Sequence, residues 1–192
     1  MKNRHYYSVG LWVLLLLVSM IPLQAQTRYT MASNVSLKVS GTSTLHDWDM
    51  TSTKATGQAM LDLENGTLKG IQTLSVEMMA ESLKSGKSQM DGNAYKALKT
   101  KQFPKISYTL KSIKRGQGDV WSATGDMTIA GVTKPLTMSV TAKKQGEVYE
   151  FSGSVPFKLT DFKIDPPSAM LGTIKTGNDV KITFSAKFNP SK

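Results

Sequence analysis

Alternating apolar and polar positions extend through most of the chain from residue 35 onward. Val35, Leu37 and Val39 alternate with serine and lysine, and the same period of two returns at 106–111, 136–143 and 180–188. This period places successive side chains on opposite faces, which is typical of strands with one buried face. Less regular strands are predicted at 44–55, 57–63, 71–80, 119–129 and 147–158. Glycine-rich turns separate the segments, so we predict antiparallel meanders.

The number of these segments limits the architecture. About eight strands with short connections can form a two-layer sandwich or a closed barrel. Closure removes the exposed edges of a sheet, and a barrel of about eight strands either packs solid or holds one small ligand. We therefore predict an all-β antiparallel barrel.

One segment, 88–101, has the period of a helix. Met90, Ala94 and Leu98 share one helical arc. Ser88 and Asp91 have the spacing of a capping box, and Pro104 follows the segment. We predict one amphipathic helix inserted in the β chain, with its apolar arc packed on the entrance of the barrel.

The apolar faces of the strands predict which side chains line an interior cavity. The chain is also rich in methionine, which packs adaptably around flexible ligands, although ordinary core filling explains any single methionine equally well. We expect an elongated interior lined by nine large side chains: Trp48, Met50, Met78, Tyr108, Trp121, Met127, Met138, Phe151 and Phe184.

The first 25 residues have a different character. Lys2 and Arg4 precede an apolar run, and Ala25 stands before a plausible cleavage site, which is the order of a secretory signal peptide. The run of about 13 apolar residues is shorter than the ~20 that a spanning helix needs, although a retained anchor is the alternative. We expect a signal peptide at 1–25, a single domain at 26–192 and a periplasmic location.

Charge is concentrated in one window. Nine basic residues and one acid lie between Lys84 and Arg115 in a chain whose formal net charge is +10. A local excess of this kind is typical of a surface that meets an anionic partner; a solvated face without a partner is the alternative. We expect Lys96, Lys99 and Lys101 to contact an anionic membrane surface transiently or an acidic partner.

Candidates for catalysis and metal binding are few. The chain has no cysteine, which excludes thiol chemistry, disulfides and thiolate metal ligands. His46 is the one histidine after the predicted signal peptide, and Asp47 and Asp49 point to the opposite strand face. We predict no catalytic residue, no metal site and no cofactor, with a hydrolase that uses His46 as the less favoured alternative.

Several motifs in the same order resemble the YceI-like family of exported lipid-binding proteins. They are the GDMTIAGVTKPL segment at 125–136, the helical segment leading to Phe103-Pro104-Lys105-Ile106, the LTDFKI and DVKI segments at 159–164 and 179–182, and the GTSTLHDW opening at 41–48. The resemblance extends from about Val35 to Phe188. It implies an extended lipocalin-like barrel, in a single YceI-like lipid-binding domain, whose interior holds a polyisoprenoid or similar amphiphile.

These observations together predict a carrier. We expect a periplasmic protein that binds a long-chain isoprenoid or other lipid and catalyses nothing. The alternative to a carrier is a non-catalytic envelope interaction protein with a solid barrel and a basic docking face. No nucleic-acid partner is expected, and the oligomeric state stays open.

Overall fold

The computed structural model describes residues 25–191. The predicted signal peptide therefore lies outside the described residues, except for Ala25, which is the first residue of a strand. The eleven strands are β1 (Ala25–Met31), β2 (Ser36–Ser43), β3 (Trp48–Ser52), β4 (Thr56–Glu64), β5 (Thr67–Met79), β6 (Lys105–Arg115), β7 (Val120–Ile129), β8 (Val132–Gln145), β9 (Val148–Lys158), β10 (Ser168–Ala169) and β11 (Ile174–Pro190). Between them lie the α-helix α1 (Ser88–Ala97) and three short 3₁₀ helices: η1 (Ala80–Ser82), η2 (Leu159–Phe162) and η3 (Met170–Gly172).

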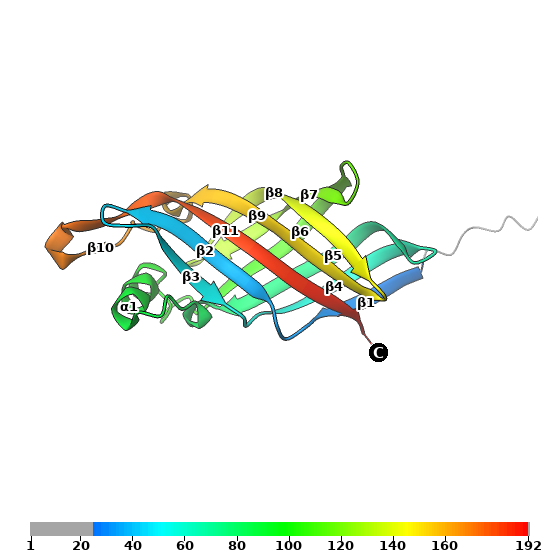
Figure 1. Cartoon of the computed structure of the whole chain (residues 1–192), viewed down its shortest axis with the longest axis horizontal. Helices are drawn as coiled ribbons and strands as arrows, with labels where there is room; N and C mark the ends of the chain where they lie inside the picture. Colours follow the sequence, from blue (N-terminus) through cyan, green and yellow to red (C-terminus); the bar gives the residue numbers. More distant parts are fainter. Residues whose placement is uncertain (1–24, 192) are drawn as a thin grey trace, which may run out of the picture.

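The strands form a closed antiparallel barrel, as predicted (Figure 1). Eight strands make the ring in the order β1-β4-β5-β6-β7-β8-β9-β11, and β1 pairs again with β11 to close it. β11 is long enough to pair with β1 at its C-terminal end and with β2 over the rest of its length. β3 pairs with β2 and extends the wall beyond the point where the ring closes.

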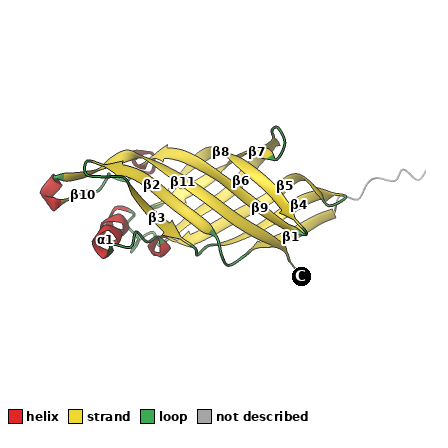
Figure 2. Ribbon diagram, in the orientation of Figure 1, coloured by secondary structure: helices red, strands yellow, loops and turns green. Residues whose placement is uncertain are grey.

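The two ends of the barrel differ (Figure 2). At the end that we call the turn end, the strands are joined by tight turns at residues 65–66, 116–119 and 146–147. At the opposite helix end lie α1 and η1 on one side and η2, β10 and η3 on the other. Among residues 25–191 no helix is long and apolar enough to cross a bilayer.

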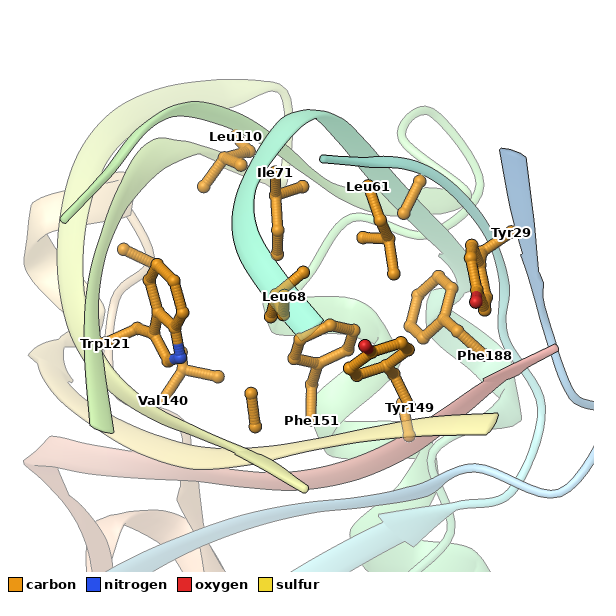
Figure 3. Packing of buried hydrophobic residues seen from close by; sticks show 14 of the residues in the cluster. Tyr29, Leu61, Leu68, Ile71, Leu110, Trp121, Val140, Tyr149, Phe151 and Phe188 are labelled. Carbon is orange, nitrogen blue, oxygen red and sulfur yellow. The ribbon is translucent and has the colours of Figure 1, made fainter. Parts of the chain in front are cut away.

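The half of the barrel nearer the turn end is filled with side chains (Figure 3). Phe188 and Leu61 are almost fully buried there. Phe151 stacks with Tyr149 and meets Phe188 edge to face, with ring centroids 6.3 and 5.6 Å apart. Aromatic rings that interlock at these distances fill the interior, and we call this packed group the turn-end core.

α1 begins and ends differently from the prediction. Lys87 precedes the helix without a side-chain cap, so the predicted capping box at Ser88 is wrong. Asp91 instead accepts hydrogen bonds from Ser85, at 2.8 Å from its backbone N and 2.6 Å from Oγ. The helix ends at Ala97 rather than at residue 101, because Lys99 adopts a left-handed conformation with φ 53°.

Candidate ligand cavity

An apolar cavity occupies the half of the barrel nearer the helix end. Its volume is about 170 Å³, more than ten times the ~10–15 Å³ that a single water molecule requires. The strands contribute side chains such as Met78, Ile106, Met127 and Ile182. The cavity can therefore hold part of a sizeable apolar molecule, and water gains few hydrogen bonds in it.

Two segments cover this cavity at the helix end. The first segment, α1 and the residue after it, contributes Ala94, Ala97 and Leu98. The second, η2 and its connection to β10, contributes Leu159, Ile164 and Pro167. Tyr95 connects α1 to the segment that precedes it. Its hydroxyl donates a hydrogen bond of 2.7 Å to the carbonyl oxygen of Leu83 and accepts one of 2.7 Å from Lys84 Nζ. The backbone of Lys84 in turn pairs with Thr51 of β3.

A second space adjoins the cavity on the outside, between α1 and residues 167–176. This outer chamber has a volume of about 290 Å³ and shares Trp48, Met50, Ala94, Pro167 and Thr176 with the inner cavity. Its further lining combines apolar side chains with polar ones: Met90, Met170 and Ile174, and Ser43, His46, Lys87, Gln89 and Asn93. The inner cavity therefore connects towards the surface through a chamber of mixed polarity.

The residues expected to line a cavity divide between the two halves of the barrel. Trp48, Met50, Met78, Tyr108 and Met127 line the inner cavity. From the helix, Ala94 and Leu98 line it as well, whereas Met90 lines the outer chamber.

The other four expected lining residues lie elsewhere, and this corrects the prediction of an interior that is hollow along its length. Trp121, Met138 and Phe151 are buried in the turn-end core, and Phe184 packs against it. Alternation places all four correctly inside the barrel. Their bulk at one level fills the interior, so the cavity is confined to the other half.

Sequence reasoning missed several lining residues, including Ile106, Ile129 and Ile182. Each lies two positions from an expected lining residue on the same strand, so the period of two could have found it. Leu159, in η2, and Ile164, in the connection after it, were missed because neither lies in a strand. Their signal was weaker: both stand in the LTDFKI motif at 159–164.

Trp48 stands at the junction of the inner cavity and the outer chamber. Its indole lies over Gly41, the residue opposite it on β2, where any Cβ would overlap the ring. The indole Nε1 donates a hydrogen bond of 2.9 Å to the carbonyl oxygen of Thr42. The glycine thus makes room for a tryptophan whose ring forms part of both walls.

Tyr108 lies where the cavity meets the turn-end core. Its ring covers Gly125 and packs against apolar side chains of both halves. Its hydroxyl is the one buried side-chain polar atom without a hydrogen-bond partner in the part of the chain that the structure describes. Burial, followed by the negative charge of Asp126, raises the pKa of Tyr108 to about 12.

A model of the YceI-like domain matches residues 27–188. The chain belongs to the YceI-like family. Among relatives, a UPF0312 protein of Pseudomonas putida is 30% identical over 109 residues, which cover 53% of this chain and 57% of that protein. The chain thus matches a little over half the length of such curated relatives.

Solved structures share the YceI-like barrel. A polyisoprenoid binding domain from Saccharophagus degradans has a TM-score of 0.68 at 9% identity, covering 87% of this chain and all (100%) of that domain. BcnA of Burkholderia cenocepacia has a TM-score of 0.67 at 16% identity, covering 80% of this chain and 95% of that one. At such identities the likeness shows a common fold.

His46 of this YceI-like chain lies outside the inner cavity, in the exposed turn between β2 and β3. Its Nδ1 lies 2.7 Å from the carbonyl oxygen of Asp47, so a backbone atom and not a carboxylate orients the ring. Residues 25–191 contain no group of three or more histidine and acidic side chains placed to hold a metal ion. The imidazole contributes to the outer chamber and to a polar surface cleft beside it.

The basic window does not form one patch, because β6 carries part of it towards the turn end. There, Lys111 pairs with Asp126 at 3.2 Å, and Arg115 lies over the ring of Trp121 at 5.5 Å. Lys96, Lys99 and Lys101 remain at the helix end, where their side chains are exposed.

Proposed function

We propose that the protein binds a long apolar molecule, such as a polyisoprenoid, and carries or buffers it without catalysis. One observation carries the proposal: the inner cavity is walled almost entirely by apolar side chains and adjoins a chamber at the helix end. Each methylene buried from water contributes about 0.8 kcal/mol. An apolar chain in this cavity therefore needs no polar contacts to bind.

The mixed lining of the outer chamber suits the polar end of an amphiphile. Lys87, Gln89 and Asn93 of the α1 segment line it together with Met90 and Met170. A ligand whose tail fills the inner cavity would place its polar end among these side chains. The proposed ligand is accordingly a long-chain amphiphile oriented tail inward. The Saccharophagus degradans domain of the same fold, described as polyisoprenoid binding, supports this ligand class.

The periplasm is the proposed location. The basic, apolar and small-residue segments in the first 25 residues support export. A carrier there would move or store a molecule that is poorly soluble in water, and the apolar cavity meets that need.

A matched pair of substitutions on β6 tests the binding proposal. Ile106 lines the inner cavity, and Thr109 is exposed on the same strand. Ile106→Trp should fill the cavity and weaken binding of farnesol by about tenfold or more, the equivalent of roughly two lost methylene contacts. Thr109→Trp should bind farnesol as the wild type does.

Native mass spectrometry measures the bound fraction, and thermal unfolding checks that both variants fold. Equal farnesol binding by the two folded variants would contradict the cavity as the binding site. Wild-type protein that binds no farnesol and purifies without any extractable lipid would contradict the carrier function itself.

A further inference from the structure

Large apolar side chains are exposed at the helix end of the barrel. The described residues include five such side chains, and three of them are Leu45 (66% exposed), Met170 (67%) and Leu171 (109%). Leu45 lies in the turn between β2 and β3, and Met170 and Leu171 lie in η3. We call these three residues the apolar rim.

The two tips that carry the apolar rim are joined to each other. The backbone N of Thr44 donates to the carbonyl oxygen of Lys175 at 3.0 Å, and the backbone N of Lys175 donates to Thr44 Oγ1 at 3.1 Å. β10 pairs with the start of β11, which fixes the hairpin that η3 caps. The β2–β3 turn and the β10–η3 segment are therefore held at the same end of the molecule (Figure 1).

The backbone at η3 is unusual for bulky apolar residues. Met170 and Leu171 have φ values of 52° and 54°, in the left-handed region that glycine and asparagine occupy at least cost. Leu171 nevertheless extends fully into solvent, and Met170 stays largely exposed although it borders the outer chamber. The need to fill a core does not account for two large apolar side chains at such a turn.

The apolar rim borders the entrance to the cavity. Met170 lines the outer chamber on one side, and Met90 of α1 lines it on the other. A surface on which the rim rests would therefore face the chamber directly. A ligand could then pass between that surface and the barrel with little exposure to water.

The charge on α1 identifies the kind of surface. The segment 84–101 contains five lysines and one acid, Asp91, which is buried against Ser85. Lys96, Lys99 and Lys101 are exposed and form no ion pair with any residue in the described range 25–191. Exposed apolar side chains and unpaired lysines at the same end of the barrel match the interface of an anionic bilayer.

We propose that the apolar rim inserts into the headgroup region of an anionic lipid bilayer and seats the entrance of the cavity on the membrane. Lys96 of α1, and Lys99 and Lys101 of the turn that follows it, contact the lipid phosphates. This docking rests on the proposed carrier function, since it supplies the route by which an apolar ligand enters and leaves.

Co-sedimentation with vesicles tests the docking. The probes are vesicles of phosphatidylglycerol mixed with phosphatidylcholine, and vesicles of phosphatidylcholine alone. Wild-type protein should bind the anionic vesicles more strongly, and salt should weaken that binding. The double variant Leu45→Ser, Leu171→Ser, which changes no residue that lines either cavity, should bind them at least about tenfold more weakly, because two apolar side chains no longer insert.

Two further variants serve as references. Val120 is 40% exposed at the turn end, so Val120→Ser should leave vesicle binding unchanged. Lys96→Glu, Lys99→Glu, Lys101→Glu should lose the preference for anionic vesicles. Equal binding by the wild type and the rim double variant, or no wild-type binding to either vesicle, would overturn the docking.

Two measurements without vesicles distinguish membrane docking from the proposed carrier function and from dimer formation through the apolar rim. The rim double variant should still bind farnesol in solution. A wild-type protein that binds no farnesol and carries no extractable lipid would instead overturn the proposed function. Analytical ultracentrifugation should show the same mass for the wild type and the rim double variant. A dimer that only the wild type forms would show that the apolar rim binds a second copy, and would also overturn the docking.

Discussion

Tyr108 carries a buried hydroxyl that donates to no other residue in the described part of the chain. An unsatisfied buried polar group costs about 1–3 kcal/mol. Tyr108→Phe should therefore raise the free energy of unfolding by about 1 kcal/mol in urea denaturation of ligand-free protein. Tyr149→Phe is the matched control, because Tyr149 donates to the Gly66 carbonyl oxygen at 3.0 Å and its loss should destabilise. A destabilised Tyr108→Phe variant would show that the hydroxyl has a partner.

The same residue predicts a dependence on pH. Burial raises the pKa of Tyr108 from 10.0 to about 12 in the folded protein. Between these values the unfolded chain loses the phenol proton and the folded chain keeps it, so stability falls as pH rises through this window. Tyr108→Phe should flatten the decline of the unfolding midpoint between pH 10.0 and about 12. An identical slope in both proteins would refute the shifted pKa.

For individual residues, the sequence predicts correctly which side chains point into the barrel. It does not predict whether an inward side chain lines the cavity or fills the turn-end core. Met78, Tyr108 and Met127 line the cavity, but Trp121, Met138 and Phe151 fill the turn-end core although their alternation is the same. A period of two reports the face of a strand. The level of a side chain along the barrel axis depends on strand register and stagger, which no single segment contains.

Asp91 fixes the start of α1 over the cavity. Its buried carboxylate accepts two hydrogen bonds from Ser85, which lower its pKa. Asp91→Ala should therefore increase amide hydrogen exchange in 88–97 while the exchange of β8 and β9 stays unchanged. It should also accelerate farnesol release. Asp126→Ala is the control, because its ion pair with Lys111 is partly exposed and pairs of that kind contribute little. Unchanged exchange in α1 would refute the role of Asp91.

Elements were predictable where their pattern was uninterrupted. The strands at 106–111, 136–143 and 180–188 were found within β6, β8 and β11. β1 was missed because its first residue, Ala25, ends the predicted signal peptide and because its sequence, AQTRYTM, alternates weakly. The helix was found, but its capping box was not formed. Ser85, three residues before Ser88, supplies the hydrogen bonds to Asp91 instead, and this pairing depends on the fold of the connection after η1.

For the molecule as a whole, the two halves should contribute unequally to stability. Phe188 is 1% exposed in the turn-end core, and Phe188→Ala should cost about 3–5 kcal/mol of unfolding free energy. Met78 borders the cavity, so Met78→Ala removes fewer contacts and should cost less than about 2 kcal/mol, below the usual range for a packed core. Urea denaturation measures both. Equal losses would contradict a division into a packed half and a ligand-binding half.

The barrel, its helix and its family could be predicted from the order of motifs, whereas the division of its interior could not. Inward side chains are apolar in both halves of the barrel. The halves differ in how much of the interior volume those side chains fill. The pairing of β9 with β11 brings together the rings of Tyr149, Phe151 and Phe188, and these rings fill the turn-end half of the barrel. The smaller side chains of Ala94 and Ala97 cover the half that contains the inner cavity.

We infer that the hollow half of the barrel binds an apolar chain. A crystal structure of the protein with farnesol tests it most directly. The predicted result is an isoprenoid chain in the inner cavity, in contact with Ile106, Met127 and Ile182, with its hydroxyl in the outer chamber near Lys87. Farnesol bound only on the outer surface, with the inner cavity closed by rearranged side chains, would contradict binding inside the barrel.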